Sequence, residues 1–467
     1  MTREPPDTIR WVDDRLGAGQ FAKRVLRYVF PEHWSFLLGE VALYSFVFLI
    51  LSGTFLALFF TPDIHSREAY SGPFAELAGF SVTPAYRSTL DLSSTVPGGL
   101  LLRQAHHWAA DVFIAAMVMH LVRVFFTGAF RRPREVIWVL GVLLLGLGIF
   151  EGFAGYSLPD DLMSGMGLAI AYGVALSLPL IGGPLAGLVW GGEYPGPGVI
   201  ESRLFIVHVF IVPLVMAAVI GLHLALVARH HHTQFPGRGR REDNTVGNPL
   251  WPGYALRSVG LMLLVSAVLV ALGGLVQINP IWQWGPYEIN RATNGAQPDW
   301  YLGWLIGGLR LMPNVEIRLG GWTLVPNPFW GGAFFPMFVF GVALAYPFVE
   351  RRLSRDRAHH NLLDRPRDHP WRTAFGVAFL SWVVLVFYAG SADRIFFQFG
   401  VSYEGQILIY RWLVLLLPPV VFVVAKKTCD ELRRSGVRPA LGGPELTVVR
   451  RADGGFDVVP TDEGRRR

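Results

Sequence analysis

Apolar residues in this chain are gathered into long runs that are separated by shorter polar segments. A helix needs about 20 apolar residues to cross a hydrocarbon core of about 30 Å, and it satisfies its own backbone hydrogen bonds there. Eight such runs are present, and we expect a membrane-spanning helix in each: residues 36–60, 104–127, 136–156, 207–228, 254–276, 331–349, 373–391 and 406–425. The pattern therefore predicts an all-α polytopic membrane protein with eight transmembrane helices.

Three other segments do not fit this pattern. The stretch 168–192 is apolar but is interrupted by Pro179, Pro184 and repeated glycines, so we expect a surface hairpin of short helices there. Residues 1–30 mix basic and apolar residues without the apolar core of a cleavable signal, which predicts an amphipathic helix on the inner membrane surface. The tail 427–467 is polar and Gly-rich. We expect this tail to be mobile and assign it no function.

The composition agrees with a membrane protein. Hydrophobic residues make up 52% of the chain and charged residues only 16%, whereas an ordinary soluble domain carries about 25% charge. The net charge of +6 comes from arginine runs between apolar segments, which suits membrane topology and lipid head groups rather than nucleic acid. The single cysteine, Cys429, excludes disulfides, iron–sulfur ligation and covalent c-type haem within this chain.

Every second loop between the predicted helices is rich in arginine. Segment 128–135 has three arginines and segment 351–372 has seven, whereas 61–102 has two and 277–330 has three. Because loops rich in arginine and lysine stay in the cytoplasm, we expect a multi-pass protein of the cell membrane with both termini cytoplasmic. The loops 61–102, 157–206 and 277–330 then lie on the outer side.

Histidines lie inside two of the predicted spans, where the surrounding hydrocarbon offers a polar ring no hydrogen bonds. His106 and His120 are 14 residues apart, so at about 100° and 1.5 Å per residue they share one helix face and lie about 21 Å apart. His208 and His223 of the fourth span are 15 residues apart, which is about 22 Å. Both spans run from the outer to the inner side. We therefore expect His106 to meet His208, and the two deeper histidines to meet near the inner side.

Two histidine pairs at two depths of a helical bundle suit two bis-imidazole haems, because axial histidine is a standard ligand of haem iron. The competing ligand on the second span is His107, which is one step off the shared face. A lone intramembrane histidine could instead be hydrogen-bonded to a neighbouring helix, but four in matching positions favour haem. We therefore predict a dihaem four-helix bundle in the first four spans, followed by further C-terminal helices.

Arginines and glycines near these histidines fit the same interpretation. Arg103 precedes His106 by three residues, and Arg123 follows His120 by three. A guanidinium there could pair with a haem propionate or reach the lipid head groups. Small residues at these depths would let the helix backbone contact a porphyrin. Two glycine pairs repeat the 14-residue interval: Gly39 with Gly53, and Gly141 with Gly155.

Several motifs together carry a resemblance to a known family. They are "RQAH" at 103–106 with His120 and Arg123, "GYSLP" at 155–159, "IGGPLAGLVWGG" at 181–192, "RLFIVH" at 203–208 and "PDWY" at 298–301. Over residues 20–425 the chain resembles cytochrome b, the haem-bearing core of the quinol–cytochrome c reductases, also called cytochrome bc complexes. The resemblance implies a low-potential haem bL on His106 and His208 near the outer face. It implies a high-potential haem bH on His120 and His223 near the inner face.

The resemblance also implies a quinol oxidation site in the loop between the fifth and sixth spans. The family carries a Pro-Glu-Trp-Tyr motif there, and this chain has Pro298-Asp299-Trp300-Tyr301. The carboxylate of Asp299 is one methylene shorter and would accept a quinol proton. Tyr156 matches another residue that lines this site in the family.

The quinone reduction site on the inner side matches the family less well. A Lys-Asp pair is usual at the start of the fifth span, whereas this chain has Arg257 and Ser258. The triple histidine at 230–232 lies near, but not at, the position of a family histidine, and it could equally form an interfacial basic patch. Glu40, an acid beside Gly39, is a candidate proton donor. The candidates for the inner site are therefore Glu40, His230, Arg257 and Ser258.

The departures from the family pattern indicate one branch of it. The 15-residue spacing in the fourth span, the unsplit chain, the eighth span and the run "HHWAA…HLVRVFFTGAFRRPRE" make the sequence most similar to actinobacterial members. That similarity implies menaquinol as the substrate. It also implies a Rieske iron–sulfur subunit, a dihaem cytochrome c subunit, a homodimer and a supercomplex with a cytochrome c oxidase.

The expected organisation is an amphipathic segment at 1–30, a dihaem bundle at 31–229, a four-span region with the quinol-site loop at 230–426 and a polar tail at 427–467. The expected function is bifurcated quinol oxidation. One electron passes to the Rieske protein and the other passes through the outer and inner haems to a quinone, coupled to proton translocation. One alternative is a dihaem membrane anchor of a dehydrogenase, which leaves eight spans and the PDWY loop unexplained. Another is a transporter that uses the histidines as a proton relay and holds no haem.

Overall fold

The structure is a computed structural model, and it describes residues 11, 13–15, 17, 19, 25–196, 198–291, 297–435, 446–450 and 456–460. The amphipathic helix expected over 1–30 lies largely outside these described residues.

Eight helices of the described chain are long and apolar enough to cross a membrane, which confirms the expected number. They are α3 (Leu37–Ala57), α5 (Gly99–Phe126), α6 (Glu135–Tyr156), α10 (Val212–His230), α11 (Ala255–Leu275), α14 (Phe335–Ser354), α15 (Pro370–Gly390) and α17 (Tyr403–Arg434). Short helical segments lead into four of them: η1 (Trp34–Phe36) into α3, α9 (Val199–Ile206) and η3 (Val207–Ile211) into α10, η4 (Leu250–Tyr254) into α11, and η6 (Trp330–Phe334) into α14. The chain is therefore a multi-pass, all-α membrane protein.

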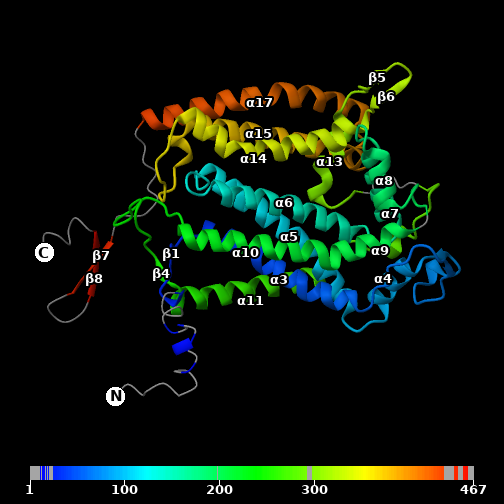
Figure 1. Cartoon of the computed structure of the whole chain (residues 1–467), viewed down its shortest axis with the longest axis horizontal. Helices are drawn as coiled ribbons and strands as arrows, with labels where there is room; N and C mark the ends of the chain where they lie inside the picture. The colour runs from blue at the N-terminus through cyan, green and yellow to red at the C-terminus, as the bar shows by residue number, and fades with distance from the viewer. Residues whose placement is uncertain are drawn as a thin grey trace.

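The membrane helices lie side by side along the long axis of the molecule (Figure 1). Among the first four spans, α5 contacts α3 and α6, and α6 contacts α10. Helix α11 contacts α3 and α5 on one side of this bundle, while α14 contacts α6 on the other side. Helices α15 and α17 contact each other beyond α14. The first four spans thus form a bundle between the remaining helices.

Close approach of helices in this bundle depends on small residues, as is usual where lipid removes the hydrophobic driving force between helices. Gly273 of α11 lies against α5, and a Cβ atom added at Gly273 would stand 2.7 Å from the Cβ of Ala105. Ala105 and Ala109 are fully buried. The fifth span is therefore seated directly on the helix that carries His106 and His120.

One end of the bundle carries most of the short elements. They lie in the three loops expected on the outer side and in the segment between α15 and α17. They are β2 (Glu68–Ala69), η2 (Ala75–Leu77), β3 (Ser81–Val82), α4 (Pro84–Ser94), α7 (Leu162–Leu176), α8 (Gly182–Trp190), α12 (Ile281–Trp284), η5 (Trp300–Leu302), α13 (Gly303–Leu311), β5 (Ile317–Leu319), β6 (Trp322–Val325) and α16 (Ala392–Phe399). Strands β2 and β3, and β5 and β6, pair as antiparallel two-stranded ribbons. The hairpin expected at 168–192 is the contacting pair α7 and α8, and it begins earlier, at Leu162.

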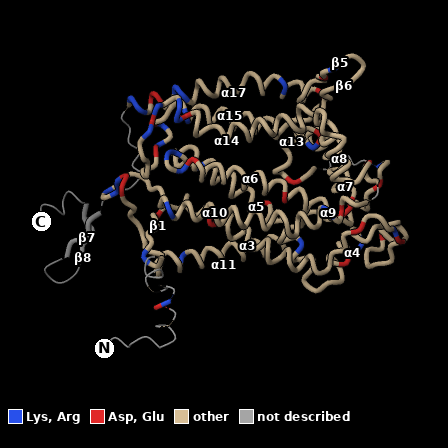
Figure 2. The backbone as a smooth tube through the Cα atoms, in the orientation of Figure 1, with Lys and Arg blue, Asp and Glu red and all other residues tan. Residues whose placement is uncertain are grey.

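The opposite end carries β1 (Val29–Phe30), which pairs antiparallel with β4 (Asn248–Pro249), and η7 (Pro366–Asp368). Figure 2 shows that lysines and arginines gather at this end, as the alternation of basic loops predicts. Helix α17 continues to Arg434, past the boundary expected at residue 426. Within the expected tail, β7 (Leu446–Arg450) pairs antiparallel with β8 (Phe456–Pro460).

A buried ion-pair network ties the basic end together. Arg372, at the start of α15, is 4% exposed and binds Glu350 of α14 through two nitrogens. Its Nη1 atom also donates to Asp364 over 2.7 Å. The other carboxylate oxygen of Asp364 accepts from Arg131 over 2.9 Å. The loops after α5 and α14 are therefore held to α15 by charge-assisted hydrogen bonds.

Candidate functional site

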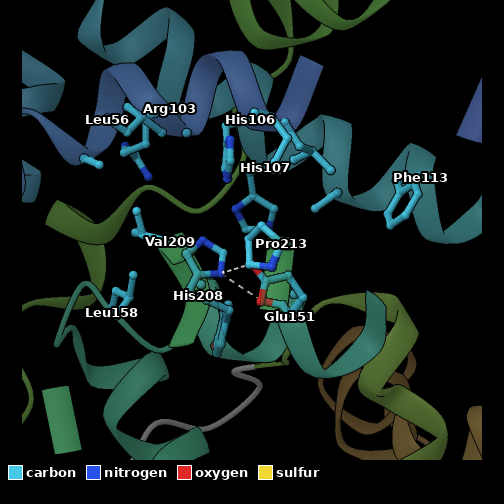
Figure 3. A pocket seen from close by; sticks show the side chains of 18 of the residues that line it. Leu56, Arg103, His106, His107, Phe113, Glu151, Leu158, His208, Val209 and Pro213 are labelled. Atoms are coloured by element: carbon cyan, nitrogen blue, oxygen red, sulfur yellow. Dashed lines mark hydrogen bonds and ion pairs between the residues drawn. The ribbon is translucent and has the colours of Figure 1, made fainter. Parts of the chain in front are cut away.

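The structure brings His106 of α5 and His208 of η3 together in a cavity of about 230 Å³ (Figure 3). We call it the outer cavity, because it lies at the end of the bundle that the sequence predicts to be on the outer side. Their ring centroids are 6.2 Å apart and the ring planes are nearly perpendicular, at 81°. Two imidazole nitrogens bound to one metal at about 2 Å each place the ring centres about 6 Å apart. The separation of the two rings therefore suits a single six-coordinate iron between them.

Hydrogen bonds fix which nitrogen each outer histidine can offer. Ser52 donates its hydroxyl to the carbonyl of Phe48 over 2.7 Å, so it accepts from Nδ1 of His106, 2.9 Å away. Nδ1 of His208 lies 2.9 Å from a carboxylate oxygen of Glu151 and 3.1 Å from the carbonyl oxygen of the same residue. Both Nδ1 atoms therefore donate, which leaves both Nε2 atoms with a lone pair for a metal.

A π-helical turn accounts for the extra residue in the fourth span. Segment η3 contains His208 and is a π-helix over Val207–Ile211. A π-turn inserts one residue into an α-helix without changing the helix beyond it. The 15-residue interval from His208 to His223 therefore behaves like the 14-residue interval of α5, and each histidine reaches the depth of its partner.

His120 and His223 line a second, larger cavity of about 1070 Å³ at the basic end of the bundle, which we call the inner cavity. Their Nδ1 atoms are buried, and within the described part of the chain neither is hydrogen-bonded to a carboxylate or hydroxyl. The two cavities thus hold the four histidines at the two depths that the spacing predicts. His107 is in the outer cavity but bonds to Asp299 instead of facing His208 as an alternative ligand would.

Each of the four glycines singled out in the sequence lies against one of these histidines. A Cβ atom added at the glycine would stand at the following distance from the nearest ring carbon, Cε1: 3.2 Å for Gly39 and His120, 3.0 Å for Gly53 and His106, 3.8 Å for Gly141 and His223, and 2.4 Å for Gly155 and His208. The first and third spans are therefore in direct contact with the rings at these four glycines, while the expected contact of these glycines with a porphyrin stays a prediction.

Both cavities also contain polar groups without a partner. In the outer cavity, Nη2 of Arg103 is buried and makes no hydrogen bond to any described residue, although other nitrogens of Arg103 bind Ser93 and the Asn279 carbonyl. In the inner cavity, Nε of Arg123 is likewise unpaired, and the guanidinium lies 5.0 Å from the centre of the Phe36 ring. Unsatisfied buried donors are costly, so the carboxylates of a haem fit both places.

The PDWY segment places its acid in the outer cavity. Oδ1 of Asp299 lies 2.7 Å from Nε2 of His107, and Oδ2 accepts the hydroxyl of Tyr301 over 2.9 Å. Asp111 lies close to both His107 and Asp299, and its Oδ1 atom is buried without a partner. The site therefore holds two carboxylates and one imidazole beside the outer histidine pair.

The other predicted members of this site differ in their positions. Tyr156, at the end of α6, lines the outer cavity together with Asp299 and Tyr301. Pro298 and Trp300 are not among the lining residues, and Trp300 is 41% exposed. Pro298 precedes η5 and Trp300 is its first residue. Helix η5 presents the Tyr301 hydroxyl toward Gly152 of α6.

Glu40 is the centre of a hydrogen-bond group in the inner cavity. One carboxylate oxygen accepts the Tyr254 hydroxyl over 2.7 Å, and the other accepts from Ser258 over 2.8 Å. The hydroxyl of Tyr44 bonds to Ser258 and lies 3.4 Å from the carboxylate. Glu40 and Ser258 are thus brought together as one group, while Arg257 pairs with Glu32 at the exposed rim.

The triple histidine divides between the cavity and its surroundings. His231 and His232 line the inner cavity, whereas His230, the residue chosen from the sequence, does not. Burial and the nearby charges of Arg134 and Arg123 lower the pKa of His232 to about 4. The reason is local: α10 ends at His230, and the backbone then turns through a positive φ of 59° at His231. That turn directs the next residues back toward the bundle.

Sequence reasoning missed Ser52, Glu151 and the bond from His107 to Asp299. A signal was present for Glu151, because an acid inside a predicted membrane span is rare and usually functional. Ser52 carried no such signal, since serine commonly bonds back to its own helix.

Comparison with known proteins identifies relatives of this chain. A family model described as "Cytochrome b(N-terminal)/b6/petB" matches residues 111–286. A protein of Streptomyces coelicolor named "Cytochrome bc1 complex cytochrome b subunit" is 44% identical over 94% of this chain and 80% of its own length. Proteins of the same name from Mycobacterium tuberculosis, at 44% identity over 94% and 80%, and Corynebacterium diphtheriae, at 43% over 94% and 81%, are similar to the same extent.

Solved structures show a similar fold. A chain of a "Hyperthermophilic respiratory Complex III" superposes with a TM-score of 0.65 at 21% sequence identity, covering 90% of this chain and all of that one.

Proposed function

The chain belongs to the cytochrome b family, as a cytochrome b subunit of the bc1 type, and from this we propose that it binds two b-type haems and carries both quinone sites of a quinol–cytochrome c reductase. The observation that carries the proposal is the pair of facing rings of His106 and His208, 6.2 Å apart. His120 and His223 form the second pair in the inner cavity.

The haem-binding residues fall into three groups in this proposal. The histidine pairs would ligate the iron atoms, and the glycines of α3 and α6 leave room beside the rings. Arg103 and Arg123 would bind propionates with the nitrogens that have no partner among the described residues. When bound, the haems would supply one-electron carriers at the two depths of the histidine pairs.

The outer cavity is the proposed site of quinol oxidation. A quinol hydroxyl is hydrogen-bonded to the carboxylate of Asp299, which accepts its proton as an electron leaves. His107 and Tyr301 hold this carboxylate from both sides, so it is oriented before substrate binds. One electron leaves to a Rieske iron–sulfur subunit outside this chain. For the other electron, haems held by His106 with His208 and by His120 with His223 would supply one-electron carriers.

The inner cavity is the proposed site of quinone reduction. Glu40 donates a proton to the bound quinone, and Tyr254 and Ser258 orient its carboxylate. Release of protons at the outer site and uptake at the inner site make the reaction proton-translocating. Moving one charge against 100 mV requires about 2.3 kcal/mol, and quinol oxidation supplies it.

We propose an assembly for this chain on the ground that its relatives are subunits of a cytochrome bc1 complex. As a bc1-type subunit it works with a Rieske subunit and a cytochrome c subunit, in a homodimer that associates with an oxidase. Its similarity to actinobacterial proteins supports menaquinol as the substrate and a dihaem cytochrome c as the partner. The gathering of lysines and arginines at the end of the bundle that carries β1 supports cytoplasmic termini.

The test is the haem content and reactivity of the purified complex. We expect two b-type haems per chain by pyridine haemochrome analysis, and quinol-dependent reduction of cytochrome c. Fewer than two b-type haems would refute the proposal. Two haems without any cytochrome c reduction by the complete complex would favour a dihaem dehydrogenase anchor.

A further inference from the structure

The two histidine pairs differ in what holds their Nδ1 atoms. In the outer pair, His106 donates to the neutral hydroxyl of Ser52, and His208 donates to Glu151. In the inner pair, neither Nδ1 meets a carboxylate or hydroxyl of the described residues. One ligand of four therefore carries a carboxylate partner, and it belongs to the outer pair.

Glu151 is placed for this contact by its helix. It lies in the third span, one residue before Gly152, and its side chain is only 16% exposed. Oε1 lies 2.9 Å from Nδ1 of His208, and Oε2 is buried without a hydrogen bond. Figure 3 shows both contacts from Glu151 to the His208 ring as dashed lines. Among the described residues, this imidazole is the one group that donates a hydrogen bond to the Glu151 carboxylate.

We propose that Glu151 is a positioning residue that lowers the reduction potential of the outer haem through His208. The inference rests on the proposed function, because it requires His208 to be an iron ligand. A carboxylate that accepts from Nδ1 makes the imidazole a stronger electron donor at Nε2. Stronger donation stabilises the ferric state more than the ferrous state and thereby lowers the potential.

This asymmetry acts on one of the two haem positions only. Among the described residues the inner pair has no carboxylate partner, so the effect would lower the outer potential and leave the inner one unchanged. It would thereby favour transfer of an electron from the outer to the inner position. The geometry assigns to Glu151 a role that the PDWY loop cannot fill, because Asp299 contacts His107 and not His208.

The experiment is a redox titration of both haems, followed by their α-band absorbance, in the complete complex with Glu151→Gln. Glutamine keeps the size of the side chain, and the carbonyl oxygen of residue 151 still accepts from His208. We expect both haems to stay bound and the outer potential to rise so that reduction is favoured about tenfold, or about 59 mV for one electron. The inner potential in the same sample should not move.

Two variants serve as controls. Glu135→Gln removes a carboxylate from the other end of the same helix, where it binds Arg351, and should leave the outer potential unchanged. Ser52→Ala removes the neutral partner of the other outer ligand and should shift that potential less than Glu151→Gln. Spectra of the unsubstituted complex without two b-type haems would refute the proposed function itself.

Two outcomes would overturn the inference alone. An unchanged outer potential in Glu151→Gln with two intact haems would show that the carboxylate does not tune the iron. Equal shifts of both potentials would show a general electrostatic effect instead of one transmitted through His208. Slower quinol oxidation with an unchanged potential would assign Glu151 to proton transfer, again against the inference.

Discussion

Nε2 of His107 lies 2.7 Å from Oδ1 of Asp299, although the two residues are 192 positions apart in the chain. The second oxygen of Asp299 accepts the hydroxyl of Tyr301, which is 2% exposed. A carboxylate fixed at both oxygens has a defined orientation before substrate arrives, which is what acid–base catalysis requires. The loop after the fifth span and the middle of the second span thus build one site.

Replacing Asp299 with asparagine should slow quinol oxidation while both haems remain bound. The amide keeps the size of the side chain but cannot accept the quinol proton, and loss of a general base reduces rates by about 10²- to 10⁴-fold. Stopped-flow reduction of the haems by quinol measures the effect, and the reduced spectrum verifies haem content.

Glu316 offers a matched control for that variant. It is an acid of the same long loop that pairs with the exposed Arg318 and does not line the outer cavity. Glu316→Gln should therefore turn over at the unsubstituted rate. Unchanged quinol oxidation in Asp299→Asn would remove the proton-accepting role from this residue.

Gly155→Ala should lose the outer haem, whereas Gly141→Ala should retain both. A methyl group at residue 155 would stand 2.4 Å from Cε1 of His208, which forces the ring to move. The same group at residue 141 would stand 3.8 Å from Cε1 of His223, an ordinary contact. The haem-to-protein ratio of the two purified variants measures the difference. Full haem content in Gly155→Ala would show that this backbone does not limit the His208 ring.

The sequence predicted the spans and the four histidines because each depends on local order along one helix. Periods of 14 and 15 residues place His106 and His120, or His208 and His223, on a face without knowledge of any neighbour. The π-turn at η3 was not predictable, because its only trace is the additional residue in that interval. It reconciles two spacings that differ by about 100° of rotation in ideal helices.

The partners of the histidines could not be predicted, since they depend on which helices become neighbours. Ser52 and Glu151 lie on the first and third spans, and they meet the rings only after α3 and α6 are arranged around α5 and η3. The same reason explains why His230, which the sequence suggested for the inner site, does not line the inner cavity. The end of α10 and the turn at His231 decide which of three adjacent histidines faces inward.

Stability of the basic end should depend on pH through Asp364. Burial alone would raise the pKa of Asp364, but hydrogen bonds from His369 and Arg372 and the charges of Arg131 and Arg372 lower it to about 2, from 3.8. A depressed pKa stabilises the folded state above the unfolded pKa, and this stabilisation is lost as the pH falls. The contribution is about 2 kcal/mol near neutral pH.

Asp364→Asn should therefore lower the melting temperature most above about pH 4. The difference between variant and unsubstituted protein should shrink as the pH falls from about 4 toward 2, because the native carboxylate is then protonated as well. Thermal unfolding in detergent, followed by tryptophan fluorescence, measures it. Asp243→Asn, which removes an exposed acid that pairs with Arg241, should show no such pH dependence. A difference that stays constant down to pH 2 would contradict this role of Asp364.

Glu40→Gln should slow quinone reduction at the inner cavity without slowing the first electron transfer from quinol at the outer one. The Glu40 carboxylate accepts hydrogen bonds from the hydroxyl groups of Tyr254 and Ser258. An amide at the same position cannot release a proton to quinone. After a pulse of quinol, the inner haem should be reduced at the normal rate and reoxidised at least about tenfold more slowly. Asp243→Asn, which removes an exposed acid that pairs with Arg241 and does not line the inner cavity, is the control and should reoxidise normally. Normal reoxidation in Glu40→Gln would mean that the proton reaches the inner quinone by another route, and His232, which lines the same cavity, would be the next residue to substitute.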